Sequence, residues 1–257
     1  MEELVGGREG AIYKRGDIVV RPLNAWSSTV HLLLNHYHAQ GLTECPTCLG
    51  VEGDTELLSY VKGDAYNYPL TGAIASETAL ITAAKLLRKL HDASTSFLSK
   101  HHTDSLTWML PARQPQEVIC HGDYSPYNVA LNGKTVVGVF DFDTAHPAPR
   151  VWDIAYAVYC WAPFKTDKID ALGTQIEQSE RAKQFCDAYG ATKQDRTVLV
   201  DTMVARLTTL VRYMHDEANA GNAQFKANIE DGHHLSYLAD IDYLKHNQET
   251  ITARLLA

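Results

Sequence analysis

Short apolar runs separated by turns occupy the first sixty positions of the chain. The runs lie at residues 4–5, 11–14, 17–21, 48–52 and 56–61, and glycine-containing turns such as Arg15-Gly16-Asp17 and Gly53-Asp54 stand between neighbours. Short runs rich in β-branched residues predict strands, and a Gly-Asp pair between two runs is a strong hairpin signal. The pattern therefore predicts an antiparallel sheet of about five strands.

The spacing of apolar positions changes between the third run and the fourth. Val30, Leu33, Leu34 and Tyr37 recur at helical intervals after two serines, and Gly41 ends the stretch. This periodicity predicts one amphipathic helix of about three turns against the sheet.

From residue 64 onward the periodicity is mostly helical. Ser76 can cap one long helix, and helical spacing continues over 151–161, 173–189, 195–217 and 233–256. The exception is the segment VALNGKTVVGVF, in which an Asn132-Gly133 turn joins two β-branched runs as a hairpin. We predict an α+β fold with a small sheet-bearing lobe over residues 1–63 and a larger, mostly helical lobe over residues 64–257.

Composition narrows the classes of partner. The chain has 23 Lys+Arg and 31 Asp+Glu, a formal net charge of -8, which argues against nucleic acid and is compatible with a cationic ligand. The N-terminal residues MEELVGGREG lack the pattern of a targeting segment, and no apolar run approaches the roughly 18 residues that span a bilayer. We expect a cytoplasmic protein with no membrane contact. The sequence does not indicate its oligomeric state.

The five cysteines do not form a disulfide framework. Only Cys45 and Cys48 are close, in a CPTC sequence, and neither a second such pair nor a matching histidine pair accompanies them. A redox or half-zinc site stays open as the less favoured alternative. The pairs His101-His102 and His233-His234 lack the i, i+4 spacing of a chelating helix face.

One motif carries a specific chemistry. Residues 121–128 read HGDYSPYN, and Asp141 follows thirteen positions after Asn128, within VFDFD. An amide oxygen and a carboxylate are hard ligands of the kind magnesium prefers, and Asp123 can accept or orient the proton of an attacking hydroxyl. Together they predict phosphoryl transfer from a magnesium-bound nucleotide.

The predicted hairpin lies between the two halves of this motif. A strict two-residue Asn132-Gly133 turn would place Asn128 opposite Val137 and leave Asp141 about 13 Å too far along a straight strand. We therefore expect a longer turn, or a chain that curls at Phe140-Asp141.

On these residues the chain resembles the aminoglycoside phosphotransferase and choline kinase-like family, which shares the protein-kinase fold. His121, Asp123 and Asn128 match the catalytic loop, with glycine at position 122 where protein kinases usually carry arginine, and Asp141-Phe142-Asp143 matches the metal-binding element. The downstream Trp152-Asp153-Ile154-Ala155 and the upstream Leu90-His91 are similar as well. The resemblance covers roughly residues 4–165 and is weak in the C-terminal helices.

The resemblance also implies a role for each matching residue. Asp123 is expected to be the catalytic base, His121 to brace the loop, and Asn128 and Asp141 to bind Mg²⁺. ATP or GTP is the expected phosphate donor, with the hinge at Ser59, Tyr60 and Val61 reading the purine edge and Gly7, in GGREG, belonging to the loop over the phosphates.

The sheet-bearing lobe departs from the family pattern. Arg21 stands where a lysine is expected, and residues 29–40 contain no acidic residue to hold it, while Glu44 lies past the helix end. Arginine is bulkier and forks onto phosphate, so we favour a phosphate contact for Arg21 over a surface ion pair. For Asp143, a second metal contact and a solvent-facing or capping carboxylate are equally open.

The predicted function is a magnesium-dependent small-molecule kinase. Its acceptor is expected to be a small hydroxylated compound, with cationic compounds among the candidates: aminoglycoside-like, an amino alcohol such as choline, or sugar-like. A homoserine- or thioribose-type metabolic kinase is the runner-up of the same fold. The alternative from another class is a catalytically weak or inactive kinase-like protein that binds a nucleotide or small ligand in a regulatory role. Arg21 without a helix acid favours that alternative, and the intact Asp123, Asn128 and Asp141 oppose it.

Overall fold

The computed structural model describes residues 2–4 and 12–257. The chain forms two compact units, each described here by itself: the first comprises Met1–Tyr66, Leu86–Asp123 and Tyr127–Arg150, and the second comprises Asn67–Lys85, Tyr124–Pro126 and Val151–Ala257. The predicted division between residues 63 and 64 remains a prediction. Among the helices of the described part, none has both the length and the apolar composition that crossing a bilayer requires.

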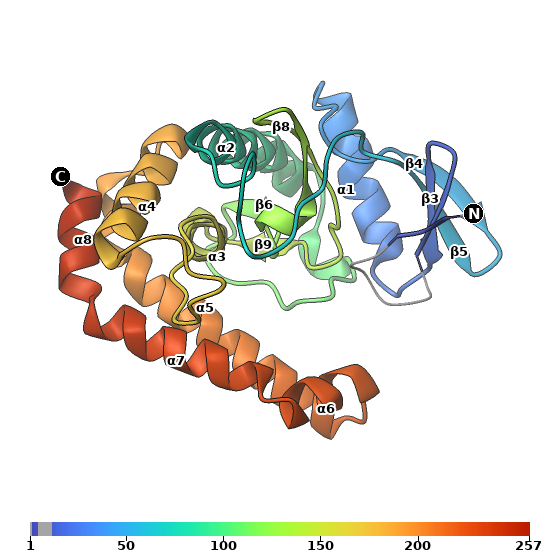
Figure 1. The fold of residues 1–257 in the computed structure, drawn as a ribbon. Coiled ribbons are helices and arrows are strands. Elements are labelled where there is room, and N and C mark those ends of the chain that lie inside the picture. The colour runs from blue at the N-terminus through green and yellow to red at the C-terminus, as the bar shows by residue number, and fades with distance from the viewer. Residues whose placement is uncertain (1, 5–11) are drawn as a thin grey trace. The chain divides into compact units, whose positions relative to one another are not determined.

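The first unit contains the predicted antiparallel sheet. Its order is β1-β2-β3-β5-β4 (Figure 1), with strands β1 Glu2–Glu3, β2 Tyr13–Arg15, β3 Ile18–Pro22, β4 Cys48–Glu52 and β5 Thr55–Ser59. The five-strand prediction is confirmed, with shifted ends. β1 precedes the predicted run at 4–5, and β5 ends at Ser59, two residues earlier than predicted.

Helix α1, Ser27–Ala39, packs beside β4 (Figure 1). The predicted apolar positions Val30, Leu33, Leu34 and Tyr37 are all at most 1% exposed. Burying one face of a short helix in this way stabilises it more than intrinsic propensity does. The predicted helix against the sheet is therefore confirmed.

Two small sheets complete the first unit. Strand β6, Val118–Cys120, pairs with β9, His146–Ala148, and strand β7, Val129–Asn132, pairs with β8, Thr135–Val139. The hairpin is confirmed, but its turn is one residue later than predicted. Asn132 pairs with Thr135, so the two turn residues are Gly133 and Lys134.

Helix α2, Glu77–Lys100, runs through parts of both units. Ser76 precedes it and accepts a hydrogen bond from the Ala79 N–H at 3.2 Å, as expected of a cap. Two short 3-10 helices follow, η1 Thr103–Ser105 and η2 Pro126–Asn128.

The second unit is helical apart from its connecting segments. Helix α5 contacts α6, α7 and α8, and α4 contacts α8; the helices are α3 Arg150–Trp161, α4 Gln175–Tyr189, α5 Lys193–Asn219, α6 Ala223–Glu230, α7 His233–His246 and α8 Gln248–Leu256. Thr174 and Thr192 form capping boxes with Glu177 and Asp195 at the starts of α4 and α5. The helical spacing predicted over 233–256 is confirmed, but it forms two helices, because Asn247 ends α7 and begins α8.

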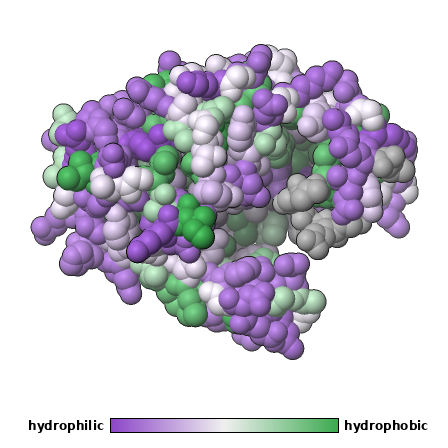
Figure 2. All heavy atoms as spheres, viewed as in Figure 1, coloured by the Kyte–Doolittle hydropathy of each residue, from purple (hydrophilic) through white to green (hydrophobic). Residues whose placement is uncertain are grey.

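Figure 2 shows one face of the molecule in space-filling form, and hydrophilic residues predominate on it. Exposed large apolar side chains occur in the second unit at Ile169, Ile176, Leu235 and Leu238. Isolated exposed apolar residues are ordinary in globular proteins. They give no separate indication of a binding surface.

Candidate functional site

The predicted catalytic loop is built around His121. This buried side chain accepts a hydrogen bond from the Asp123 N–H at Nδ1, 3.3 Å, and its Nε2 lies 3.0 Å from the Phe140 carbonyl oxygen. A carbonyl only accepts, so Nε2 carries the proton and the ring is neutral. The ring of Phe142 packs against it at 4.7 Å between centroids. These contacts hold the His121 ring within the loop, and the bracing role that the family resemblance implies for it stays a prediction.

The backbone of the catalytic loop admits only glycine at position 122. The φ of Gly122 is +83°, and a Cβ built there would lie 2.3 Å from the carbonyl oxygen of Thr144. Real Cβ atoms do not approach backbone oxygen this closely. Only glycine fits this backbone, so the arginine that protein kinases usually carry has no place here.

Asp123 is oriented by two neighbours in the first unit. Tyr127 donates its hydroxyl to Oδ1 at 2.9 Å, and the side-chain amide of Asn128 donates to Oδ2 and to the Asp123 carbonyl, both at 2.9 Å. These bonds fix the Asn128 amide with its nitrogen toward Asp123. The side-chain oxygen is then the atom of Asn128 that can coordinate a cation.

The hairpin brings Asp141 next to Asn128. A strict Asn132-Gly133 turn would have placed Asn128 opposite Val137, but the Phe140 N–H bonds the Asn128 carbonyl at 2.9 Å. Two residues of this shift come from the turn at Gly133-Lys134, and one comes from a bulge that leaves Val137 unpaired between the partners of Leu131 and Ala130. The shifted turn and the bulge together therefore bring Asp141 toward Asn128.

The chain also curls at Asp141, as one of the two sequence alternatives required. Asp141 has φ +65°, and it is the one non-glycine residue with positive φ in the described part of the chain. This backbone conformation costs free energy for an L-residue and clusters at functional sites. The side chain of Asp141 is 48% exposed.

Arg21 lies at the centre of a cluster of carboxylates. Its Nε donates to Glu56 Oε1 at 2.7 Å, Nη1 to Asp141 Oδ1 at 3.2 Å and Nη2 to Asp143 Oδ1 at 2.7 Å. The other Glu56 oxygen contacts Nε2 of His31, from α1. Arg21 is 7% exposed and Glu56 is fully buried. The ion pairs of Arg21 are thus not those of a surface residue.

The acid that was missing from the helix comes from a strand. Helix α1 indeed carries no carboxylate and contributes His31, while Glu56 lies on β5 directly opposite Arg21 of β3. Glu44, the poor substitute, pairs instead with Lys89 at 2.5 Å. The signal that could have identified Glu56 is a carboxylate at the start of the predicted strand ELLSYV. A charged residue is rarely buried without a partner.

The cluster shifts the protonation equilibria of its members. Burial disfavours the charge of Glu56, but the hydrogen bond from His31 and the charge of Arg21 outweigh it and hold the pKa of Glu56 below its ordinary value. Burial also opposes the charge of Arg21, yet Asp143, Glu56 and Asp141 together raise the pKa of the guanidinium. For Asp143, burial prevails over the attraction of Arg21, and its pKa is raised.

The donor set fits a divalent cation. Asn128, Asp141 and Asp143 offer amide and carboxylate oxygens, the hard ligands that magnesium takes, and three carboxylates around one guanidinium leave negative charge to neutralise. Asp143 is neither solvent-facing nor a cap, since its side chain is 18% exposed and bonds Arg21. A metal contact for Asp143 stays a prediction.

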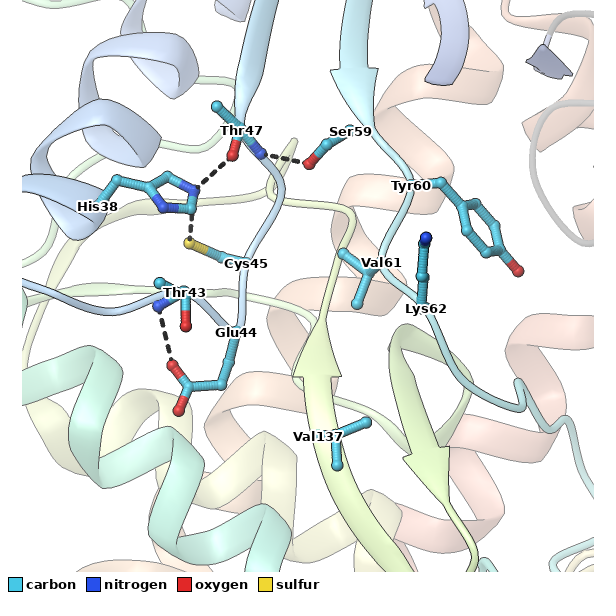
Figure 3. Close-up of a pocket in the computed structure, with 10 residues that line it drawn as sticks. All are labelled: His38, Thr43, Glu44, Cys45, Thr47, Ser59, Tyr60, Val61, Lys62 and Val137. Atoms are coloured by element: carbon cyan, nitrogen blue, oxygen red, sulfur yellow. Dashed lines mark hydrogen bonds between the residues drawn. The ribbon is translucent and has the colours of Figure 1, made fainter. Parts of the chain in front are cut away.

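The predicted hinge residues line a cavity of about 350 Å³ in the first unit. Figure 3 shows Ser59, Tyr60 and Val61 beside Lys62, with residues of α1, of the loop over 43–47 and Val137 of β8 around the same cavity. The Ser59 and Tyr60 N–H groups already bond the carbonyls of Thr47 and Asp17. Of these three hinge N–H groups, only that of Val61 has no backbone partner among the described residues.

Two other sequence features have different outcomes. Gly7 and the GGREG segment lie outside the described residues. Cys45 and Cys48 are free thiols; Cys45 is buried, and burial raises the pKa of its thiol to about 12. A buried thiol of raised pKa is a poor redox nucleophile or metal ligand. The CPTC sequence therefore has no support as a redox or zinc site.

Two comparisons of the sequence relate the chain to known proteins. Residues 100–199 match the phosphotransferase enzyme family. The trifolitoxin immunity protein of Rhizobium leguminosarum bv. trifolii is 29% identical over 266 residues, covering 98% of this chain and 97% of that protein.

Solved structures show the fold. A GDP complex of an aminoglycoside 2'-phosphotransferase has a TM-score of 0.59 at 13% identity, covering 98% of this chain and 93% of that one. The ethanolamine kinase of Plasmodium vivax has a TM-score of 0.56 at 11% identity, covering 87% and 75%. The predicted α+β, protein-kinase-like fold is confirmed. The chain's resemblance to the aminoglycoside phosphotransferase and choline kinase-like family is confirmed with it.

Proposed function

We propose that the protein transfers the γ-phosphate of ATP or GTP to a hydroxyl of a small molecule and requires Mg²⁺. The observation that carries this proposal is the assembly of Asp123, Asn128 and Asp141 in one unit with Arg21 among the carboxylates. The match over residues 100–199 and the nucleotide-bound structural relative support it.

In this reaction the acceptor oxygen bonds to the γ-phosphorus as the bond to the leaving nucleoside diphosphate breaks. Asp123, oriented by Tyr127 and Asn128, accepts the hydroxyl proton. Because the transition state is loose, positioning and neutralisation of charge contribute more than strong base catalysis. Arg21 binds the phosphates, and Val61 offers its N–H to the purine.

Mg²⁺ would be held by Asn128 and Asp141, with Asp143 as a further ligand. Bound there, it would neutralise charge on the triphosphate. The pKa of Asp143 is raised, so a cation is also what would favour its ionised form. In the same proposal, residues 1–63 bind the nucleotide and residues 64–257 complete catalysis and bind the acceptor.

The acceptor class follows from supporting observations. The relatives' names include an aminoglycoside phosphotransferase and an ethanolamine kinase, whose acceptors carry both hydroxyl and amino groups. A net charge of -8 favours such cationic compounds over nucleic acid. We propose an aminoglycoside-like compound, an amino alcohol or a sugar-like compound as acceptor. We also propose a cytoplasmic location, because ATP and GTP would be the donors.

The test is nucleotide-dependent thermal shift with and without Mg²⁺, followed by slow nucleotide hydrolysis. ATP or GTP with Mg²⁺ should stabilise the protein by about 2.7 kcal/mol at 100 times Kd. Hydrolysis should be lost in Asp123→Ala and Asp141→Ala and kept in Asp54→Ala, whose exposed side chain lies at a hairpin turn of the same unit. No stabilisation by either nucleotide, or unchanged hydrolysis in both site variants, contradicts the proposal.

A second candidate is favoured by the relative that spans nearly the whole chain, which is named an immunity protein. In this reading the protein protects a cell from a toxic compound by binding it, as a kinase-like protein of weak or no activity. Expression of the protein in a host that is sensitive to the toxic compound distinguishes this function from the kinase function. Protection that survives Asp123→Asn supports binding alone, and protection lost in that variant supports phosphorylation of the toxic compound.

A further inference from the structure

Each nitrogen of the Arg21 guanidinium donates a hydrogen bond to a carboxylate. Nε bonds a buried carboxylate, and the two terminal nitrogens bond the carboxylates of Asp141 and Asp143. These two kinds of partner differ in exposure. The side chain of Glu56 is 0% exposed, whereas those of Asp141 and Asp143 are 48% and 18% exposed. One end of the fork is thus held inside the protein, and the other faces the proposed metal site.

Glu56 itself is held from two elements. It lies opposite Arg21 in the antiparallel pairing of β3 with β5, so its carboxylate reaches Nε from the neighbouring strand. Its second oxygen contacts His31 of α1. A carboxylate whose two oxygens bind different elements has little freedom to rotate.

We propose that Glu56, held by His31, is the positioning residue of Arg21. It fixes Nε so that the two terminal nitrogens point toward Asp141, Asp143 and the phosphates of the bound nucleotide. The strand thereby supplies the acid that α1 lacks, and α1 supplies the group that holds the acid. This inference rests on the proposed function.

The physical reason is the geometry of the guanidinium. Arginine is permanently charged and binds phosphate through two parallel N–H groups, so the direction of its plane determines whether both can bind at once. Without Glu56, Nε loses its partner and the side chain regains rotamers. The charge remains, but the guanidinium plane no longer has a fixed orientation. A smaller fraction of molecules then holds it preorganised for the phosphates.

The test measures binding of Mg²⁺–ATP and Mg²⁺–GTP by calorimetry in five proteins. These are the wild type, Glu56→Gln, Arg21→Ala, the double variant His31→Glu with Glu56→Gln, and the control Glu52→Gln. Glu52 forms an exposed ion pair with Arg15 in the same sheet, 3.4 Å long, so it matches the charge change away from Arg21. The double variant returns the carboxylate to the helix at the position that faces residue 56.

Glu56→Gln should weaken binding by about tenfold, because glutamine keeps an acceptor oxygen but loses the charge that strengthens the hydrogen bond to Nε. The control should bind like the wild type, and the double variant should return to within about threefold of it. A purely structural role for Glu56 would not be rescued by a carboxylate on another element.

The outcomes separate this inference from the proposed function. A folded Glu56→Gln that binds like the wild type overturns this inference alone. If that variant does not fold, the double variant decides: binding near the wild-type value supports the inference, and a folded double variant that binds no better than Arg21→Ala overturns it. No nucleotide binding by the wild type overturns both.

Discussion

Gly122 places the strictest demand on a single residue in the site. Two independent features act on it, a positive φ and a Cβ position 2.3 Å from the Thr144 carbonyl oxygen. Gly133 in the hairpin turn has a similar φ of +60° but nothing within 4 Å of its Cβ position. The two glycines therefore separate backbone strain from steric overlap.

We expect Gly122→Ala to lower the free energy of unfolding by on the order of 3 kcal/mol, since strain and overlap add. Gly133→Ala should cost about 1 kcal/mol, from the left-handed backbone alone. Urea unfolding of both variants measures the difference. Equal losses in the two variants would show that the loop yields to the added methyl group.

The cysteines give a second prediction for single residues. Cys45, Cys120, Cys160 and Cys186 are buried, whereas Cys48 is half-buried. Burial raises the pKa of the Cys45 and Cys186 thiols to about 12, so few thiolates form at pH 8.

Iodoacetamide at pH 8 should therefore label Cys48 first in the folded protein and all five cysteines in urea, as read by mass spectrometry of peptides. The Cys48→Ser variant is the control and should lose the rapid adduct. Labelling of Cys45 as fast as Cys48 would restore the redox interpretation of CPTC.

At the scale of elements, Glu56 links β3, β5 and α1, and its ionisation should be visible in stability. Its pKa in the folded protein is lowered from an ordinary value of 4.5, because the hydrogen bond from His31 and the charge of Arg21 outweigh burial. A lowered pKa means that the carboxylate stabilises the fold fully above the ordinary value. That contribution is lost as pH falls through the folded-state pKa.

Glu56→Gln should accordingly lower the free energy of unfolding by about 2 kcal/mol at pH 7, the range for hydrogen bonds to charged groups. The difference from the wild type should narrow as pH falls below 4.5, the ordinary value for glutamate. Urea unfolding at several pH values measures it, with Glu52→Gln as the exposed control. A difference that stays constant into acid would mean that Glu56 is stabilised by packing and not by its charge.

Elements whose signals are local were predicted well. The helix face at Val30, Leu33, Leu34 and Tyr37 and the Ser76 cap depend on residues within one or two turns, and both are confirmed. The break at Asn247 is less visible, because apolar spacing continues on both sides of it. Helix α6 was missed for a related reason, since none of its residues is buried and no apolar stripe marks it.

Pairings across strands were predicted only in part. The meeting of Asn128 with Asp141 required a shift of the turn and a bulge at Val137, neither of which has a strong sequence signal. The Arg21–Glu56 pair depends on register, which follows from the whole sheet. The family resemblance predicts an acidic partner for Arg21 on the helix. The register of β3 with β5 instead makes Glu56, on a strand, that partner.

For the whole molecule, the described residues of the proposed nucleotide site all belong to the first unit. Arg21, Glu56, Val61, Asp123 and Asn128 lie there together with Asp141 and Asp143. Helices α4 to α8 belong to the second unit and contribute none of these groups. We therefore expect nucleotide binding to stabilise segments of the first unit more than segments of the second.

Hydrogen exchange measured by mass spectrometry tests this distribution. At 100 times Kd, Mg²⁺–nucleotide should slow exchange by up to about 100-fold where opening requires ligand release, and such segments should be β3, β5 and β7–β8. Peptides from α7 and α8 should change little, because their contacts lie within the second unit. Asp141→Asn, which removes a proposed metal ligand, should abolish the protection in the first unit. Protection concentrated in α7 and α8 instead would place the nucleotide outside the cluster around Arg21, and the roles proposed for Asn128 and Asp141 would fail with it.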